Sequence, residues 1–229
     1  SRETELLDPL SAAQHVNGIL LTGGSSFGLD AAGGVVKYLE EKGVGLKIGR
    51  LNVPLIPSAV LFDLSFISSE VRPTFDDGYK AAEAASKIFQ RGSVGVGTGC
   101  TVAKILGMKS AVKGGVGTSS VKIADGTTIG AIIAVNAIGD VVDPELGNVV
   151  AGPLFENKKG FHNSSEMLIN ESITYRDFFR NTVIGVVATD AKLNKIQTTR
   201  LAMAAQDGIT LAIRPAHMQS DGDTIFALS

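Results

Sequence analysis

The 27 glycines of this 229-residue chain, spread among short apolar segments, constrain its fold more than any other sequence feature. Glycine weakens helix interiors and marks turns and close approaches between backbones. Most of the apolar runs between these glycines have the length of strands, and a few longer segments carry apolar residues at helical spacing. Strands grouped together with helices on either side predict a layered α+β sandwich rather than a parallel βαβ arrangement.

Hydrophobic periodicity and turn residues give approximate element bounds. Strands are predicted at 16–22, 59–64, 94–99, 109–123 and 127–142, from Thr182 onward, and after the loop at 217–224. Helices are predicted at 29–41, 76–89 and 194–213. Asp125-Gly126 is a typical turn between two long antiparallel strands, and 152–181 is predicted to be an exposed connector.

Bulk composition limits the classes of partner. The chain is 44% hydrophobic and 19% charged, which predicts one domain over residues 1–229 with a buried core. A net charge of −2 gives no overall support for binding nucleic acid or an anionic membrane, so a small substrate fits better. The single cysteine, Cys100, excludes an intrachain disulfide; it agrees with a cytoplasmic location and equally with a cysteine-poor exported protein. The chain starts at Ser1 without an initiator methionine, which predicts that upstream sequence is missing.

Thr182 is the first candidate nucleophile. It follows Arg180-Asn181 and leads into the apolar run 183–188, so its hydroxyl lies at the start of a predicted buried strand. If the chain were cut before Thr182, the new α-amine would lie beside the hydroxyl and accept its proton. The alternative interpretation is an ordinary threonine in a strand, because β-branched residues favour strands.

Two aspartates near the C-terminal end are candidates to orient such an amine. Asp221 and Asp223 flank a glycine, a composition that is also common in simple turns. Together with His217 they form a possible metal-binding set, but His15 and His162 are distant in sequence and a hydrolytic metal site needs further ligands.

Three further residues have both a functional and a structural interpretation. Asn136 lies inside an apolar strand, so its amide either satisfies core backbone groups or donates to an oxyanion. Lys104 follows the glycine-rich run 95–99 and either lies in solvent or points inward. This run lacks the Gly-Lys-Ser/Thr ending of a phosphate loop, and Cys100 has no histidine nearby in sequence, which favours a buried apolar role.

Six motifs occur in one order along nearly the whole chain. They are Thr22-Gly23-Gly24-Ser25-Ser26-Phe27-Gly28-Leu29-Asp30, Gly97-Thr98-Gly99, Lys113-Gly114-Gly115-Val116-Gly117, Val135-Asn136-Ala137, Asn181-Thr182 and Asp221-Gly222-Asp223-Thr224-Ile225-Phe226-Ala227. In this set the chain resembles the self-cleaving peptidase family that contains L-aminopeptidase D-amidase/esterases, β-aminopeptidases and nylon-oligomer hydrolases. Joint occurrence is far more specific than any single glycine-rich motif.

The resemblance implies a four-layer αββα sandwich, similar in layering to N-terminal nucleophile hydrolases but with different connectivity. It implies autocleavage between Asn181 and Thr182 into 1–181 (α chain) and 182–229 (β chain). It also implies hydrolysis of small peptides, amino-acid amides or esters through an acyl-enzyme, with no metal or organic cofactor, in a homo-oligomer that is a tetramer of processed protomers. The implied catalytic residues are Thr182, Asn136, Lys104, Asp221 and Asp223, and the implied substrate-binding residues are Phe62, Gly23, Gly24 and Ser25.

The chain departs from the family pattern at three points. Phe62 stands where several relatives have an active-site tyrosine, and both ends look trimmed. A threonine nucleophile with an aspartate pair also leans away from the β-aminopeptidases, which tend to carry serine and glutamate. Two alternatives stay open: acyl transfer of the ornithine acetyltransferase type, and a catalytically silent binding or assembly protein.

Overall fold

A four-stranded sheet forms the centre of the computed structural model, which describes residues 1–170 and 181–229. Its strands, in spatial order, are β13 (Thr224–Leu228), β11 (Thr182–Thr189), β8 (Thr128–Asn136) and β7 (Gly115–Lys122). β11 is antiparallel to β8 and parallel to β13. The predicted turn joins β7 and β8, where Gly126 has a φ of 92° that glycine adopts without steric cost.

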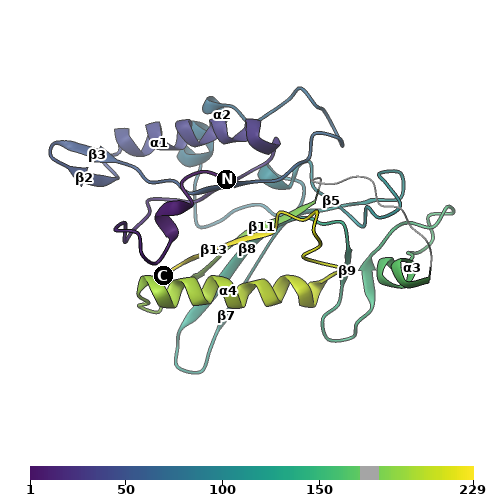
Figure 1. Ribbon diagram of the computed structural model, residues 1–229. Helices are drawn as coiled ribbons and strands as arrows, with labels where there is room; N and C mark the ends of the chain where they lie inside the picture. The colour runs from purple at the N-terminus through teal and green to yellow at the C-terminus, as the bar shows by residue number, and fades with distance from the viewer. Residues whose placement is uncertain (171–180) are drawn as a thin grey trace.

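Two further layers cover one face of this sheet. β1 (Leu20–Thr22) and β4 (Ser58–Val60) form a short parallel pair, and α1 (Ala31–Glu41) and α2 (Phe75–Glu83) lie beyond it. α4 (Lys195–Ala212) lies against the opposite face, so Figure 1 shows helices, strands, strands and a helix in turn. The predicted αββα sandwich is therefore confirmed.

Side chains alternate along β11 between two hydrophobic clusters. Val183 and Val187 pack with Ile209 of α4, whereas Ile184 and Val186 pack with residues of the β1–β4 side such as Leu61. Because successive residues face opposite ways, Thr182 shares the face of Ile184. The start of β11 thus directs the threonine hydroxyl into the space between the two β layers.

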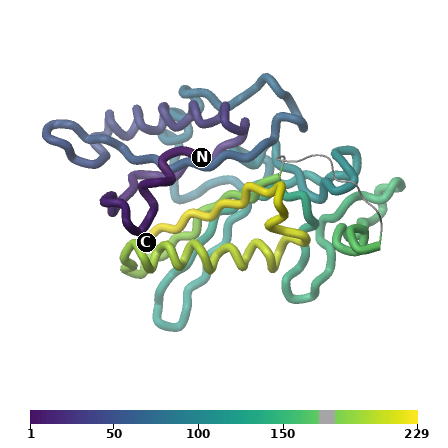
Figure 2. The backbone as a smooth tube through the Cα atoms, in the orientation of Figure 1, coloured from purple at the N-terminus to yellow at the C-terminus, as the bar shows by residue number. Residues whose placement is uncertain are grey.

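The path of the chain explains how distant segments meet in this sheet. Figure 2 shows the purple and blue N-terminal part on the side of α1, and the yellow C-terminal strand running beside the green strand β11. β8, from the middle of the chain, pairs with the other edge of β11 from Thr182↔Asn136 to Thr189↔Ile129.

The structure corrects several predicted bounds. β1 and β4 have three residues each, and the predicted strand at 94–99 is instead the 3₁₀ helix η3 (Gly95–Gly97). The two long strands are interrupted, giving β6 (Val112–Lys113) before β7 and β9 (Asp140–Val142) after β8. α2 ends at Glu83 rather than 89, because residues 83–90 are exposed and a longer helix would bury no apolar face there.

The predicted connector also contains regular structure. α3 (Ser164–Asn170) begins where Ser164 donates from its backbone N–H to the buried carboxylate of Asp140, a tertiary contact that local periodicity does not reveal. Residues 171–180 of this predicted connector lie outside the described residues. The remaining elements are η1 (Glu5–Leu7), η2 (Ser25–Asp30), β2 (Leu46–Ile48), β3 (Leu51–Val53), β5 (Thr101–Val102), β10 (Val149–Ala151) and β12 (Ile213–Arg214). None of the described helices combines the length and apolarity that a membrane span requires.

Candidate active site

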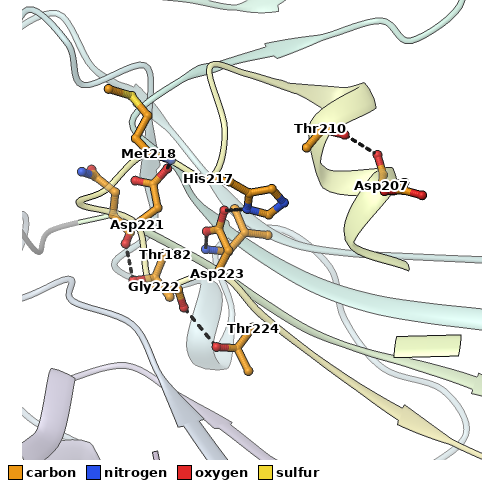
Figure 3. Close-up of polar contacts among 11 residues, drawn as sticks. Thr182, Asp207, Thr210, His217, Met218, Asp221, Gly222, Asp223 and Thr224 are labelled. Atoms are coloured by element: carbon orange, nitrogen blue, oxygen red, sulfur yellow. Dashed lines mark hydrogen bonds and ion pairs between the residues drawn. The ribbon is translucent and has the colours of Figure 1, made fainter. Parts of the chain in front are cut away.

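Thr182 occupies the first position of β11 and is 7% exposed. Its Oγ donates to the carbonyl oxygen of Asn181 at 2.5 Å, so the hydroxyl lies directly beside the carbonyl group that precedes it (Figure 3). Directly opposite Thr182 in the β11–β8 register is Asn136. The candidate nucleophile therefore lies beside the carbonyl group of the Asn181–Thr182 peptide bond.

The backbone of the loop before β13 contacts the same carbonyl. The N–H of Gly222 donates to the Asn181 oxygen at 3.1 Å, and Asn181 and Asp221 form an isolated parallel bridge. A Cβ atom at position 222 would lie 3.3 Å from the Oγ of Thr182, tighter than most such contacts, so glycine allows the loop to approach this closely. The Asn181 oxygen therefore accepts from a backbone donor and from the candidate nucleophile at once.

On the other side of Thr182, a side chain of the same loop holds the backbone. The Oδ1 of Asp223 accepts from the N–H of Val183 at 2.7 Å, and its Oδ2 lies 2.8 Å from the Nδ1 of His217. The parallel ladder between β11 and β13 begins one residue later, at Ile184↔Thr224. At Val183, where the ladder with β13 has not yet begun, the Asp223 carboxylate is therefore the acceptor for the backbone N–H.

Asn136 and Lys104 form a buried polar pair next to Thr182. Asn136 is 1% exposed; its Oδ1 accepts from Thr101 N at 3.0 Å and from Lys104 Nζ at 3.0 Å. The Nζ of Lys104 also donates to the Asn136 carbonyl at 2.8 Å, and the Nδ2 of Asn136 donates to the Phe62 carbonyl at 2.9 Å. Lys104 thus points inward, and Asn136 satisfies core groups as well as facing the start of β11.

Burial shifts the pKa of two of these groups. It lowers the pKa of the Lys104 ammonium to about 7, because the charged form loses hydration. It raises the pKa of the Asp221 carboxyl, and the neighbouring Asp223 carboxylate adds to this effect. Among the described residues, the buried Oδ1 of Asp221 has no hydrogen-bond partner, while its Oδ2 accepts from Met218 N. Such perturbed groups are concentrated at functional sites.

Of two cavities on this side of the molecule, the smaller one borders the cluster, and Asp63 connects it to the larger one. One of about 20 Å³ is lined by Phe62, Lys104 and Asn181, and one of about 390 Å³ lies between β1, α2 and the loop at 67–73. Asp63 lines both of them. Its Oδ1 accepts from Gly24 N at 2.8 Å.

The predicted substrate-binding residues are distributed unevenly around these cavities. Phe62 lines the small cavity and Gly23 the larger one, where a Cβ atom at position 23 would lie 2.4 Å from the Oδ2 of Asp63. Gly24 and Ser25 are not among the described residues that line either cavity, and both are held by backbone contacts, to Asp63 and to the Leu61 carbonyl.

The structure also bears on the alternative interpretations. Cys100 is fully buried and burial raises the pKa of its thiol to about 12, which fits the apolar role. Within the described ranges, no three or more His, Cys, Asp or Glu side chains are arranged to hold a metal ion, and the Nδ1 of His217 lies 2.8 Å from the Oδ2 of Asp223. Sequence reasoning missed Gly222 and Thr101, because both act through backbone N–H groups that any residue type except proline carries.

Comparisons with known proteins identify the family of this chain and a structure with the same fold. The family model "Peptidase family S58" matches residues 1–229. An uncharacterised aminopeptidase of Mycobacterium leprae is 43% identical over 100% of this chain and 64% of its own length. A 6-aminohexanoate-oligomer endohydrolase of Agromyces sp. is 27% identical over 92% of this chain and 59% of its own length. The chain therefore spans about two thirds of the length of the curated relatives it matches.

A solved structure shows the same fold. The L-aminopeptidase D-Ala-esterase/amidase of Ochrobactrum anthropi, described as a variant of the N-terminal nucleophile hydrolase fold, aligns with a TM-score of 0.60 and 22% identity over 89% of this chain and 51% of that one. At this identity the likeness establishes the fold alone. Since the family model matches the chain from its first residue to its last, this protein belongs to peptidase family S58.

Proposed function

We propose that this chain is a self-cleaving amide-bond hydrolase, with Thr182 as the N-terminal nucleophile of residues 182–229 after cleavage. The observation that carries this proposal is the pair of contacts on one oxygen: Thr182 Oγ at 2.5 Å and Gly222 N at 3.1 Å from the Asn181 carbonyl oxygen. Membership of a peptidase family supports it, as do relatives named aminopeptidase and oligomer endohydrolase.

The first stage cuts the chain. Thr182 Oγ attacks the Asn181 carbonyl carbon, and the negative charge that develops on the carbonyl oxygen is stabilised by the Gly222 N–H. We assign the neutral form of Lys104, which is substantially populated at and above pH 7, to accept the hydroxyl proton. The peptide C–N bond breaks, the nitrogen takes up a proton, and an ester links Asn181 to Oγ. Water hydrolyses this ester and leaves a free α-amine on Thr182.

The second stage is turnover. The α-amine of Thr182 accepts the Oγ proton as Oγ attacks a substrate amide, and Asn136 donates to the oxyanion from its side-chain amide. Asp221 is placed to receive the new ammonium group, because its buried Oδ1 has no partner among the described residues. The C–N bond of the substrate amide then breaks, and the substrate's amine leaves with the proton that the Thr182 α-amine had accepted. Water hydrolyses the remaining acyl-enzyme.

Small peptides and amino-acid amides or esters are the proposed substrates. The 390 Å³ cavity beside Asp63 has a mostly apolar lining that includes Leu20, Leu21 and Val96, and it has room for one substrate side chain. Assembly into a homo-oligomer and a cytoplasmic location remain predictions.

Intact-mass spectrometry tests the proposal. The unmodified chain should separate into species of residues 1–181 and 182–229, whereas Thr182→Ala should remain one species, because alanine has no hydroxyl. Thr182→Ser is the matched control, since serine keeps a hydroxyl at the same carbon, and it should still cleave. Equal processing of the unmodified chain and Thr182→Ala would remove Thr182 from this role.

A panel of aminoacyl p-nitroanilides, amino-acid amides and short 6-aminohexanoate oligomers then measures turnover of the processed protein. Release of free acid supports hydrolysis. Products formed mainly by aminolysis when an amine acceptor is added would point to acyl transfer instead.

A further inference from the structure

His217 belongs to the loop that contacts Thr182 on both sides, but the proposed mechanism gives it no part. Its backbone φ is 54°, in the left-handed region that few residues other than glycine adopt. Its side chain is 36% exposed, whereas that of its partner Asp223 is 6% exposed. An imidazole at the rim of the site therefore pairs with a carboxylate inside it.

The contacts form a chain that ends at the backbone of the nucleophile. His217 Nδ1 lies 2.8 Å from Asp223 Oδ2, and Asp223 Oδ1 accepts from Val183 N at 2.7 Å, one residue after Thr182 (Figure 3). Asp223 thus links the imidazole, at one carboxylate oxygen, to the backbone next to Thr182, at the other.

The charges around this chain explain why the carboxylate needs a partner. Asp221 lies two residues away in the same loop, where burial and the Asp223 carboxylate both raise its pKa. The buried Asp223 carboxylate needs a donor at each oxygen; Oδ1 accepts from the Val183 N–H, and Oδ2 requires a side-chain donor. His217 is the described side chain that supplies this donor.

Resting on the proposed function, we propose that His217 is a positioning residue for Thr182. It donates from Nδ1 to Asp223, which fixes the backbone at Val183, so that the Thr182 hydroxyl keeps its place in self-cleavage and in turnover. His217 touches neither the scissile carbonyl nor the substrate in this assignment, and its effect passes through Asp223.

Three substitutions at this position separate the donor from the backbone conformation. His217→Asn keeps an N–H donor the same number of bonds from Cβ as Nδ1, and asparagine tolerates a left-handed φ. His217→Gly tolerates this φ but has no donor. His217→Asp matches asparagine in shape and repels Asp223. Self-cleavage is followed by intact mass, turnover by release of p-nitroaniline per processed chain, and folding by circular dichroism.

We expect His217→Asn to self-cleave within about threefold of the unmodified rate, and His217→Gly at least about tenfold more slowly, because a tenfold loss corresponds to one ordinary hydrogen bond. In turnover, kcat should fall in the glycine variant while KM stays close to the unmodified value. Imidazole added to the glycine variant should restore part of the rate, since the position is partly open to solvent.

Equal rates for the unmodified, asparagine and glycine proteins would overturn this assignment, as would equal slowing of the asparagine and glycine variants with both folded. If the glycine variant does not fold, the asparagine and aspartate variants are compared. Self-cleavage that is fast in His217→Asn and slow in His217→Asp supports the assignment, and equal self-cleavage rates contradict it. Thr182→Ala keeps the outcomes separate, because its processing would contradict the proposed function, whatever the result at position 217.

Discussion

At the scale of single residues, Asn136 combines two roles that the sequence presents as alternatives. Its Oδ1 accepts from Thr101 N and Lys104 Nζ, so it provides the hydrogen-bond acceptor for two buried donors. Its amide also lies opposite Thr182, where the proposed oxyanion donor belongs. An alanine substitution mixes the two roles, because it removes the acceptor and the donor together and costs about 1–3 kcal/mol of stability for the donors left unpaired.

Asn136→Asp separates these roles. Aspartate keeps acceptors for Thr101 and Lys104 but lacks the N–H₂ group and with it the donor to the Phe62 carbonyl. We therefore expect the protein to fold with a stability lower by about 1–3 kcal/mol, while kcat falls by about 100- to 1,000-fold. Thermal unfolding and p-nitroanilide turnover measure the two effects on one sample. Unchanged kcat in a folded Asn136→Asp protein would leave Asn136 with its core role alone.

Lys104 makes a prediction about pH. The pKa of Lys104 is about 7 in the folded protein and near 10.5 when the chain is unfolded, so between these values the unfolded chain binds more protons. The free energy of unfolding should therefore rise with pH from about 7 to 10, by up to about 1.4 kcal/mol per pH unit. Lys104→Met should lose this slope. Urea unfolding at several pH values measures the slope of the unfolding free energy against pH, with Thr182→Ala as the common background. Identical slopes for the proteins with Lys104 and with Met at this position would show that Lys104 is not buried as described.

At the scale of elements, the αα layer depends on two glycines. A Cβ atom at Gly78 of α2 would lie 1.8 Å from the Ala31 carbonyl oxygen, and one at Gly34 of α1 would lie 1.8 Å from the Phe75 carbonyl oxygen. The two helices therefore meet backbone to backbone. Both helices line the 390 Å³ cavity together with β1, whose end leads into the Gly23-Gly24 turn beside Asp63.

Gly78→Ala should destabilise the protein by about 1–3 kcal/mol or more, because backbone atoms must move apart. Gly208→Ala is the matched control: this glycine lies within α4, and a Cβ atom there meets nothing within 4 Å. Alanine at 208 should stabilise the protein by about 0.5–1 kcal/mol. Denaturant unfolding measures the change in the free energy of unfolding for each variant. A stabilising effect of Gly78→Ala, like that expected of Gly208→Ala, would contradict the close contact of α1 and α2.

At the scale of the whole molecule, the predicted cut passes through a sheet that holds both products together. β11 belongs to 182–229 and pairs with β8 of 1–181 over the whole length from Thr182 to Thr189. The core cluster between sheet and α4 also draws on both parts, with Val102 and Ala137 from one and Ile209 and Ile225 from the other. Cleavage therefore removes one covalent bond without removing the shared core.

We expect the processed protein to elute from a size-exclusion column as one species that contains both fragments, and to separate only in denaturant. Residues 182–229 expressed alone should not fold, since β11 would lose β8 on one edge. Circular dichroism of that fragment checks the second expectation. Dissociation of the two fragments under native conditions would contradict the arrangement of the sheet.

The amino-acid sequence by itself determined the layered fold class, the family, and the residues Thr182, Asn136, Lys104, Asp221 and Asp223 as candidates, because apolar periodicity and the order of motifs are local properties of the chain. It placed α1 and α4 to within a few residues, because caps such as Asn194 are local too. Only the tertiary structure decided that Lys104 points inward, that α3 interrupts the predicted connector, and that Gly222 and Asp223 hold the backbone on either side of Thr182. Those features depend on segments 24 to 41 residues apart packing together, and backbone donors and buried charges acquire their properties only from such neighbours.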